Sequence, residues 1–163
     1  MKKLTTRIAV FALLVAAAAS VSAQGAKPNF SGTWNLDLPK SDFGPSPPPE
    51  SIVLVVAHKE PAVKVSSTQK TAEGTVLNER NLTTDGKPNP NKIKTADGEQ
   101  AVTSTSKWVA NKLVTSYQIQ MQGMALDLTD TWELSADSKV LTIVRDVKTP
   151  QGDFSLKTVY NKR

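Results

Sequence analysis

The 163-residue sequence contains no cysteine, and His58 is its only histidine. The absence of cysteine excludes disulfides, thiol catalysis, thiolate metal sites and a lipid anchor on an N-terminal cysteine. Zinc sites take three or four protein ligands, so one histidine without cysteine supplies too few. We therefore expect no metal and no cofactor, and we expect His58 to be a loop residue beside Lys59.

The motifs that mark most enzyme sites are also missing. The sequence has no glycine-rich phosphate loop, no acyl-transfer elbow and no pair of acidic residues at catalytic spacing. No motif typical of a histidine-based triad flanks His58. Only Asp130, Arg145 and Tyr117 stand out as titratable candidates, which is too few to suggest a reaction. The sequence predicts a protein that is not an enzyme.

Long hydrophobic runs are absent except near the N-terminus. A basic segment ending at Arg7 precedes an apolar run over 8–19 that is too short to span a bilayer comfortably. The small residues Ser20-Val21-Ser22-Ala23 follow it. This pattern predicts a secretory signal peptide over residues 1–23. We expect a periplasmic or secreted protein with no stable membrane insertion after cleavage.

The excess of positive charge is largely confined to the same segment. The whole chain carries a net charge of +5, but three of its 20 basic and none of its 15 acidic residues lie in residues 1–23, which leaves about +2 for the rest. The other basic residues are scattered among acidic ones, whereas a nucleic-acid surface needs clustered positive charge. No nucleic-acid partner is expected.

Sustained helical periodicity is absent from residues 24–163, where short segments alternate apolar and polar residues. The clearest alternation runs from Met124 to Leu134. Turn sequences such as Asp85-Gly86 separate these segments, which makes successive strands antiparallel neighbours. About 8–10 strands avoid exposed edges when the sheet closes on itself. The sequence predicts one all-β domain over 24–163, an antiparallel up-and-down β-barrel.

Three stretches interrupt the alternation. The continuously apolar run from Ile52 to Val56 suggests either a strand buried on both faces or an inner strand that leans on the proline-rich loop. Five of the ten prolines fall in 39–49, which predicts a loop with room for one helical turn at Asp42-Phe43. Pro88 to Pro90 is expected to extend the loop after Asp85-Gly86.

Both ends of this predicted barrel resemble known families. Phe30-Ser31-Gly32-Thr33-Trp34 resembles the opening strand of the lipocalins and the fatty-acid-binding proteins, and Val159-Tyr160-Asn161-Lys162 resembles the closing strand of the latter. The hairpin around Trp132 is similar to that of small exported bacterial lipocalin-like proteins. The resemblance implies a calycin-type barrel closed by Gly32, Trp34 and Tyr160.

The sequence departs from these families in two places. Lipocalins usually stack an arginine from near the last strand on the opening tryptophan, and here only Arg145 fits that role, one strand early. Fatty-acid-binding proteins cap the barrel with two helices after the first strand, where this chain has its proline-rich loop. In barrels of this group such a segment often crosses or caps an opening, so the resemblance implies that position for the loop. The nature of any bound ligand is therefore left open by the resemblance.

Several inward-facing candidates could line an interior pocket, because a barrel of this size can hold one small ligand. They are Trp108, Tyr117, Ile119, Leu126, Leu128, Asp130, Trp132 and Arg145. Asp130 interrupts an apolar face, so it either pairs with Arg145 or Lys107 inside the barrel or lies on a bulge near the rim. Arg145 could hold an anionic ligand group, stack on an aromatic ring or point outward.

Two functions remain compatible with these residues. The first is an exported barrel that binds a small, largely apolar ligand in its interior. The second is a structural or interaction protein whose barrel is filled by its own side chains. A cavity of ligand size distinguishes the first from the second.

Overall fold

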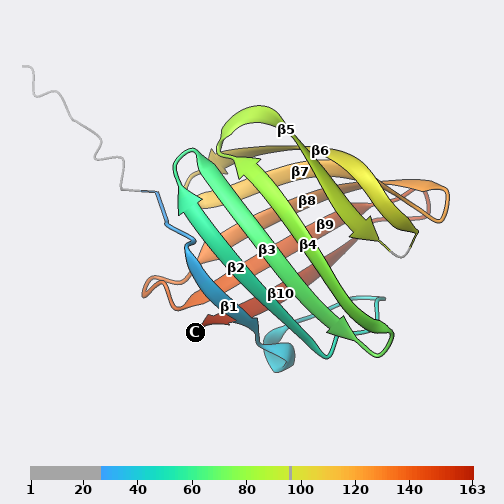
Figure 1. Ribbon diagram of the computed structural model, residues 1–163, viewed down its shortest axis with the longest axis horizontal. Helices are drawn as coiled ribbons and strands as arrows, with labels where there is room; N and C mark the ends of the chain where they lie inside the picture. Colours follow the sequence, from blue (N-terminus) through green and yellow to red (C-terminus); the bar gives the residue numbers. More distant parts are fainter. Residues whose placement is uncertain (1–26, 96) are drawn as a thin grey trace, which may run out of the picture.

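The computed structural model describes residues 27–95 and 97–163 and contains ten antiparallel strands (Figure 1). The predicted signal peptide at 1–23 lies outside the described residues. The strands are β1 (Gly32–Leu36), β2 (Ser51–Lys59), β3 (Ala62–Thr71), β4 (Gly74–Thr83), β5 (Asp85–Thr95), β6 (Gly98–Val109), β7 (Lys112–Met121), β8 (Met124–Leu134), β9 (Val140–Lys148) and β10 (Phe154–Lys162).

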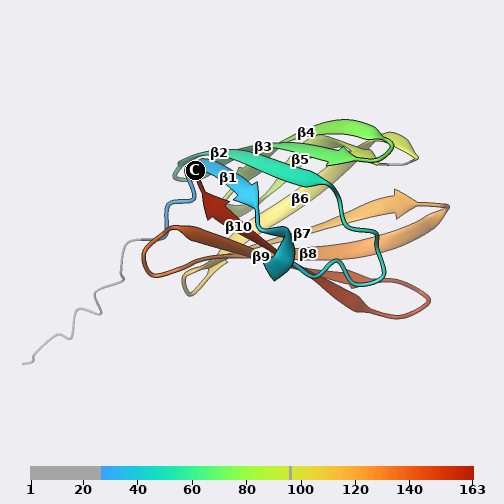
Figure 2. The same ribbon diagram turned by 90° about the horizontal axis from the view of Figure 1, so that it is seen from below.

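The strands form one sheet in the order β4-β3-β2-β1-β10-β9-β8-β7-β6-β5. Apart from the β1–β10 contact, neighbours in this order are consecutive in sequence, as in an up-and-down meander. The sheet curls so that β4 and β5 approach each other and nearly close the barrel (Figures 1 and 2). The predicted fold class is confirmed. Among the residues that the structure describes, no helix is long and apolar enough to cross a membrane.

The contact between β4 and β5 lacks a backbone ladder and is made by asparagine side chains. The Asn78 amide donates to Lys94 O at 3.2 Å and accepts from Lys94 N at 2.6 Å. The Asn91 amide makes the same pair of bonds with the backbone of Asn81, at 2.9 and 2.6 Å. Because Lys94 turns its backbone toward β4, the alternation of the strand turns Pro88 and Pro90 the same way, and neither has an N–H to donate.

Those prolines correct one expectation, because Pro88 and Pro90 lie within β5 rather than in a loop. A strand can hold them because each faces the side on which no ladder forms. The apolar run in β2 is not buried on both faces, which was one of its two predicted arrangements. Ile52, Leu54 and Val56 point inward and are buried, whereas Val55 faces outward and is half exposed.

Two apolar clusters line the barrel interior at different heights. The larger lies at the closed end and includes Phe30, Trp34, Leu113, Trp132 and Leu141, all fully buried. The smaller lies toward the other end and consists of Val102, Ile119, Leu126, Leu128 and Val147. Between them, polar residues face inward at the middle of β6 to β9: Ser104, Ser106, Thr115, Tyr117, Asp130 and Arg145.

The residues before β1 seal the closed end. The Phe30 ring stacks on His58 and Trp108 and meets Trp132 edge-on, and the Trp34 indole donates to Phe30 O at 2.9 Å. His58 is buried near the end of β2 rather than placed in a loop. Its Nδ1 accepts a hydrogen bond from the Phe30 backbone N–H at 3.1 Å. His58 therefore holds the segment that plugs the barrel.

The cation that covers Trp34 is Lys162, whose ammonium lies 5.1 Å from the ring centroid. Arg145, the expected candidate, lies elsewhere in the barrel. Gly32 makes the lysine contact possible, because a Cβ at that position would come within 2.7 Å of Lys162 Cε. The last residues of β10 therefore close the barrel against its first strand.

The proline-rich loop lies across the other end of the barrel. A 3-10 helix at Leu38–Lys40 leads into residues 41–50, here called the strap. Asp42 pairs with Lys157 of β10 through two backbone hydrogen bonds, at 2.7 and 2.8 Å. The single helical turn thus precedes the expected position at Asp42-Phe43. The strap lies over an opening of the barrel, as the resemblance implied (Figure 2).

Candidate ligand-binding cavity

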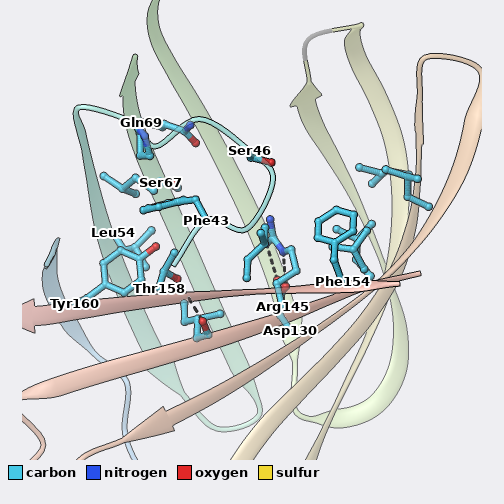
Figure 3. Close-up of a pocket in the computed structure, with 18 of the residues that line it drawn as sticks. Phe43, Ser46, Leu54, Ser67, Gln69, Asp130, Arg145, Phe154, Thr158 and Tyr160 are labelled. Carbon is cyan, nitrogen blue, oxygen red and sulfur yellow. Dashed lines mark hydrogen bonds and ion pairs between the residues drawn. The ribbon is translucent and has the colours of Figure 1, made fainter. Parts of the chain in front are cut away.

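A cavity of about 420 Å³ lies inside the barrel beneath the strap (Figure 3). Its upper wall is formed by strap residues that include Phe43 and Pro49, and its sides by β2, β3, β4 and β7 to β10. The lining is mostly apolar and includes Ile52, Leu54, Ile119, Met121, Leu126, Leu128, Trp132, Ile143, Val147, Phe154, Leu156 and Tyr160. Pockets of a few hundred Å³ with apolar walls are typical of small-molecule sites.

A charged cluster forms the floor of the cavity. Asp130 is fully buried. Arg145 donates two hydrogen bonds to it, from Nε to Oδ1 at 2.6 Å and from Nη2 to Oδ2 at 2.9 Å. Arg80 Nη1 donates to the same Oδ2 at 3.3 Å, and the Tyr117 hydroxyl donates to it at 3.1 Å. Both guanidinium groups lie beside the Tyr117 ring, 5.6 and 5.9 Å from its centroid.

Strand register explains how this cluster forms. Asp130 and Arg145 are direct cross-strand partners in β8 and β9, so both side chains point to the same face. Tyr117 lies two residues after the buried Thr115 in β7, so the period of two turns its side chain to the same inner face. Arg80 comes from β4, across the barrel, and reaches Asp130 because the sheet curls back on itself. The cluster therefore exists only in the nearly closed barrel.

The negative charge of Asp130 and the positive charges of the two arginines stabilise one another. Burial alone would raise the pKa of Asp130, but the positive charges and hydrogen bonds of Arg145 and then Arg80 hold the pKa below its usual value. Burial would lower the pKa of Arg145, and Asp130 outweighs this effect and raises it. Burial raises the pKa of Tyr117. At neutral pH the cluster contains two cations, one carboxylate and a neutral phenol.

Part of the hydrogen-bonding capacity of the two arginines is left over. Arg80 uses Nη1, and Arg145 uses Nε and Nη2. Within residues 27–95 and 97–163, no acceptor contacts Nε or Nη2 of Arg80 or Nη1 of Arg145. Both arginines line the cavity, with 19% and 35% of their side-chain surface exposed. These N–H groups are the strongest donors available to a bound molecule.

The structure brings most of the predicted pocket residues together. Ile119, Leu126, Leu128, Asp130, Trp132 and Arg145 line the cavity. Tyr117 lies against the floor, where it bonds Asp130, and Lys107 takes no part in the cluster. Trp108 does not line the cavity but stacks on Phe30 at the closed end, where its indole donates to Glu60 at 2.9 Å. Tyr160, predicted to close the barrel, also forms part of the cavity wall.

Sequence reasoning missed Arg80 and the β2–β3 wall. The segment Asn78-Glu79-Arg80-Asn81 is polar throughout and reads as a solvent-facing strand. One signal was present, since Arg80 shares the inward period of β4 with buried Leu82. On β3, Ser67 and Gln69 line the cavity in the same register as buried Val65. No group of metal-binding side chains occurs in the part of the chain that the structure describes.

Comparison with known proteins gives structural likenesses only: no protein-family model and no curated sequence matches the chain. The fluorescent protein UnaG superposes with a TM-score of 0.57 and 17% identity over 82% of this chain and 97% of its own. A secretory abundant heat soluble (SAHS) protein from Ramazzottius varieornatus gives 0.54 and 9%, and SAHS protein 4 from the same organism gives 0.52 and 12%. Both comparisons cover 82% of this chain and 94% of the other.

The chain has a calycin-type β-barrel fold. The match extends over nearly the whole described domain, and identities this low carry the fold and nothing more about function. In this barrel a strap lies over the mouth, and the cavity beneath it has apolar walls and a charged floor.

Proposed function

We propose that this calycin-type barrel binds a small, largely apolar ligand that has one polar end. The polar end lies at the unused N–H groups of Arg80 and Arg145, and the apolar body lies among the residues nearer the strap. The single observation that carries this proposal is the cavity of about 420 Å³, apolar along its sides and charged at its floor.

The alternative of a side-chain-filled barrel describes only the closed end. There Phe30, Trp34 and Trp132 leave no exposed surface, whereas the strap end holds the cavity. The chain lacks any recognisable catalytic motif.

Export is part of the proposal, supported by the basic start, short apolar run and small residues of 1–23. Fractionation of cells that produce the full chain tests it directly. We expect the protein in the periplasm or medium with Gln24 as its first residue. A cytoplasmic protein that retains residues 1–23 would contradict export without touching the ligand-binding proposal.

Ligand binding can be tested with N-phenyl-1-naphthylamine, a neutral aromatic probe whose fluorescence rises in apolar surroundings. We expect saturable binding by the wild-type protein. Ser67 lines the cavity from β3, so Ser67→Trp fills part of it and should weaken probe binding about tenfold or more.

Ser66 supplies the matched control, because it neighbours Ser67 on the outer face of the same strand. Ser66→Trp adds the same side chain outside the cavity and should leave probe affinity unchanged. Absence of saturable binding in the wild type, or equal binding by both variants, would refute the proposal.

A further inference from the structure

The floor of the cavity carries more positive than negative charge. Arg80, Asp130 and Arg145 are the only charged residues among those that line it in the described chain. Two cations and one carboxylate leave one net positive charge. Because an uncompensated charge is costly away from water, a ligand that fills the cavity and excludes water should bring one negative charge.

The carboxylate of Asp130 also occupies the place that a ligand anion would otherwise take. It accepts two hydrogen bonds from Arg145 and one from Arg80, and only 1% of its side-chain surface is exposed. Arg145 therefore keeps one free terminal nitrogen, while Arg80 keeps a whole N–H edge. A ligand anion is expected at Arg80, because Arg145 already donates two of its nitrogens to Asp130.

We infer that Asp130 is a specificity-determining residue that limits the ligand to a single negative charge. This inference rests on the proposed function. The ligand class is an amphiphile with a singly charged head, such as a carboxylate or sulfate ester. A doubly charged phosphate monoester would leave a net negative charge beside Asp130, and a neutral alcohol would leave the positive charge uncompensated.

Three probes with the same alkyl chain separate these cases: decan-1-ol, decyl sulfate and decyl phosphate. At about pH 8.5 their heads carry zero, one and two negative charges, because the second phosphate pKa is near 6. Displacement of N-phenyl-1-naphthylamine from the protein is measured with decyl sulfate and decyl phosphate below their critical micelle concentrations and with decan-1-ol below its solubility limit. The wild type should bind decyl sulfate more tightly than either of the other two, by about tenfold.

Charge-changing variants should reorder the three probes. Arg80→Gln leaves Asp130 paired with Arg145 and removes the net charge, so decan-1-ol should gain about tenfold over decyl sulfate. Asp130→Asn raises the net charge to two, so decyl phosphate should gain about tenfold over decyl sulfate. The double variant returns to one charge and should again prefer decyl sulfate. A general loosening of the fold would weaken all three probes together.

Arg80→Gln keeps the buried ion pair, so it decides the question even if Asp130→Asn fails to fold. An unchanged preference for decyl sulfate in Arg80→Gln would overturn the inference, as would equal displacement by all three probes in the wild type. In either case binding of the naphthylamine itself would leave the proposed function standing. Failure of the wild type to bind the naphthylamine would refute the proposed function first.

Discussion

Asp130→Asn offers the most informative test of the charged floor through protein stability. The substitution preserves the size of the side chain and removes its charge, which leaves Arg145 and Arg80 facing each other without a counter-ion. Removing one partner of a buried ion pair typically costs about 3–5 kcal/mol. Because 35% of the Arg145 side chain and 19% of Arg80 are exposed, solvent relieves part of this cost, and we expect about 3 kcal/mol.

The effect of Arg80→Gln on the free energy of unfolding should have opposite signs in the wild type and in Asp130→Asn. In the wild type, Arg80→Gln removes one hydrogen bond to Asp130, at 3.3 Å, and should cost about 1 kcal/mol or less. In the Asp130→Asn background the same change removes one of two repelling cations and should restore about 1 kcal/mol. The double variant should therefore be more stable than Asp130→Asn alone.

Urea unfolding followed by tryptophan emission measures all four proteins, since Trp34 and Trp132 are fully buried and report on the closed end. The comparison uses midpoints at equal denaturant slopes. A cost below about 1 kcal/mol for Asp130→Asn would refute a buried charged cluster, because the cluster would then be effectively solvated. Equal destabilisation of the wild type and of Asp130→Asn by Arg80→Gln would refute it as well.

Three further predictions follow from other parts of the barrel. The pKa of Asp130 is lowered in the folded state, so its contribution is present above the unfolded pKa of about 3.9 and lost as pH falls through the folded value. The difference in melting temperature between wild type and Asp130→Asn should therefore be constant from pH 7 to about 5 and shrink below about pH 4. Gly32→Ala should cost about 1 kcal/mol more than Gly74→Ala in urea unfolding, because both glycines have positive φ but only Gly32 is crowded by a neighbouring lysine. Asn78→Ala and Asn91→Ala should each speed amide exchange in β4 and β5 about tenfold and leave β8 and β9 unchanged, a result that uniform acceleration would contradict.

Much of the barrel could be predicted because burial of one face imposes a period of two on each strand. From β6 to β9 this period is visible in the sequence, and it shows that Asp130 is a charged residue on an otherwise apolar face. Arg145 is one of the two partners that the sequence predicts for Asp130, and the two residues are direct cross-strand neighbours in β8 and β9. A contact between adjacent strands is accessible to sequence reasoning because the hairpin fixes its register.

Contacts that depend on closure of the sheet were beyond the same reasoning. Arg80 is 50 positions from Asp130, and its neighbours are polar, so no local pattern marks it as buried. His58 likewise gains its buried position from Phe30, which reaches the closed end from before β1. Pro88 and Pro90 read as a loop because local propensity cannot show that one side of β5 lacks a ladder.

Native mass spectrometry of the protein purified from cells that produce the full chain is the most direct test for a bound ligand. We expect a bound small molecule on the wild-type protein and on Ser66→Trp, and its loss from Ser67→Trp. A bare mass for all three proteins, together with no saturable binding of N-phenyl-1-naphthylamine, would contradict a ligand-binding role for the cavity.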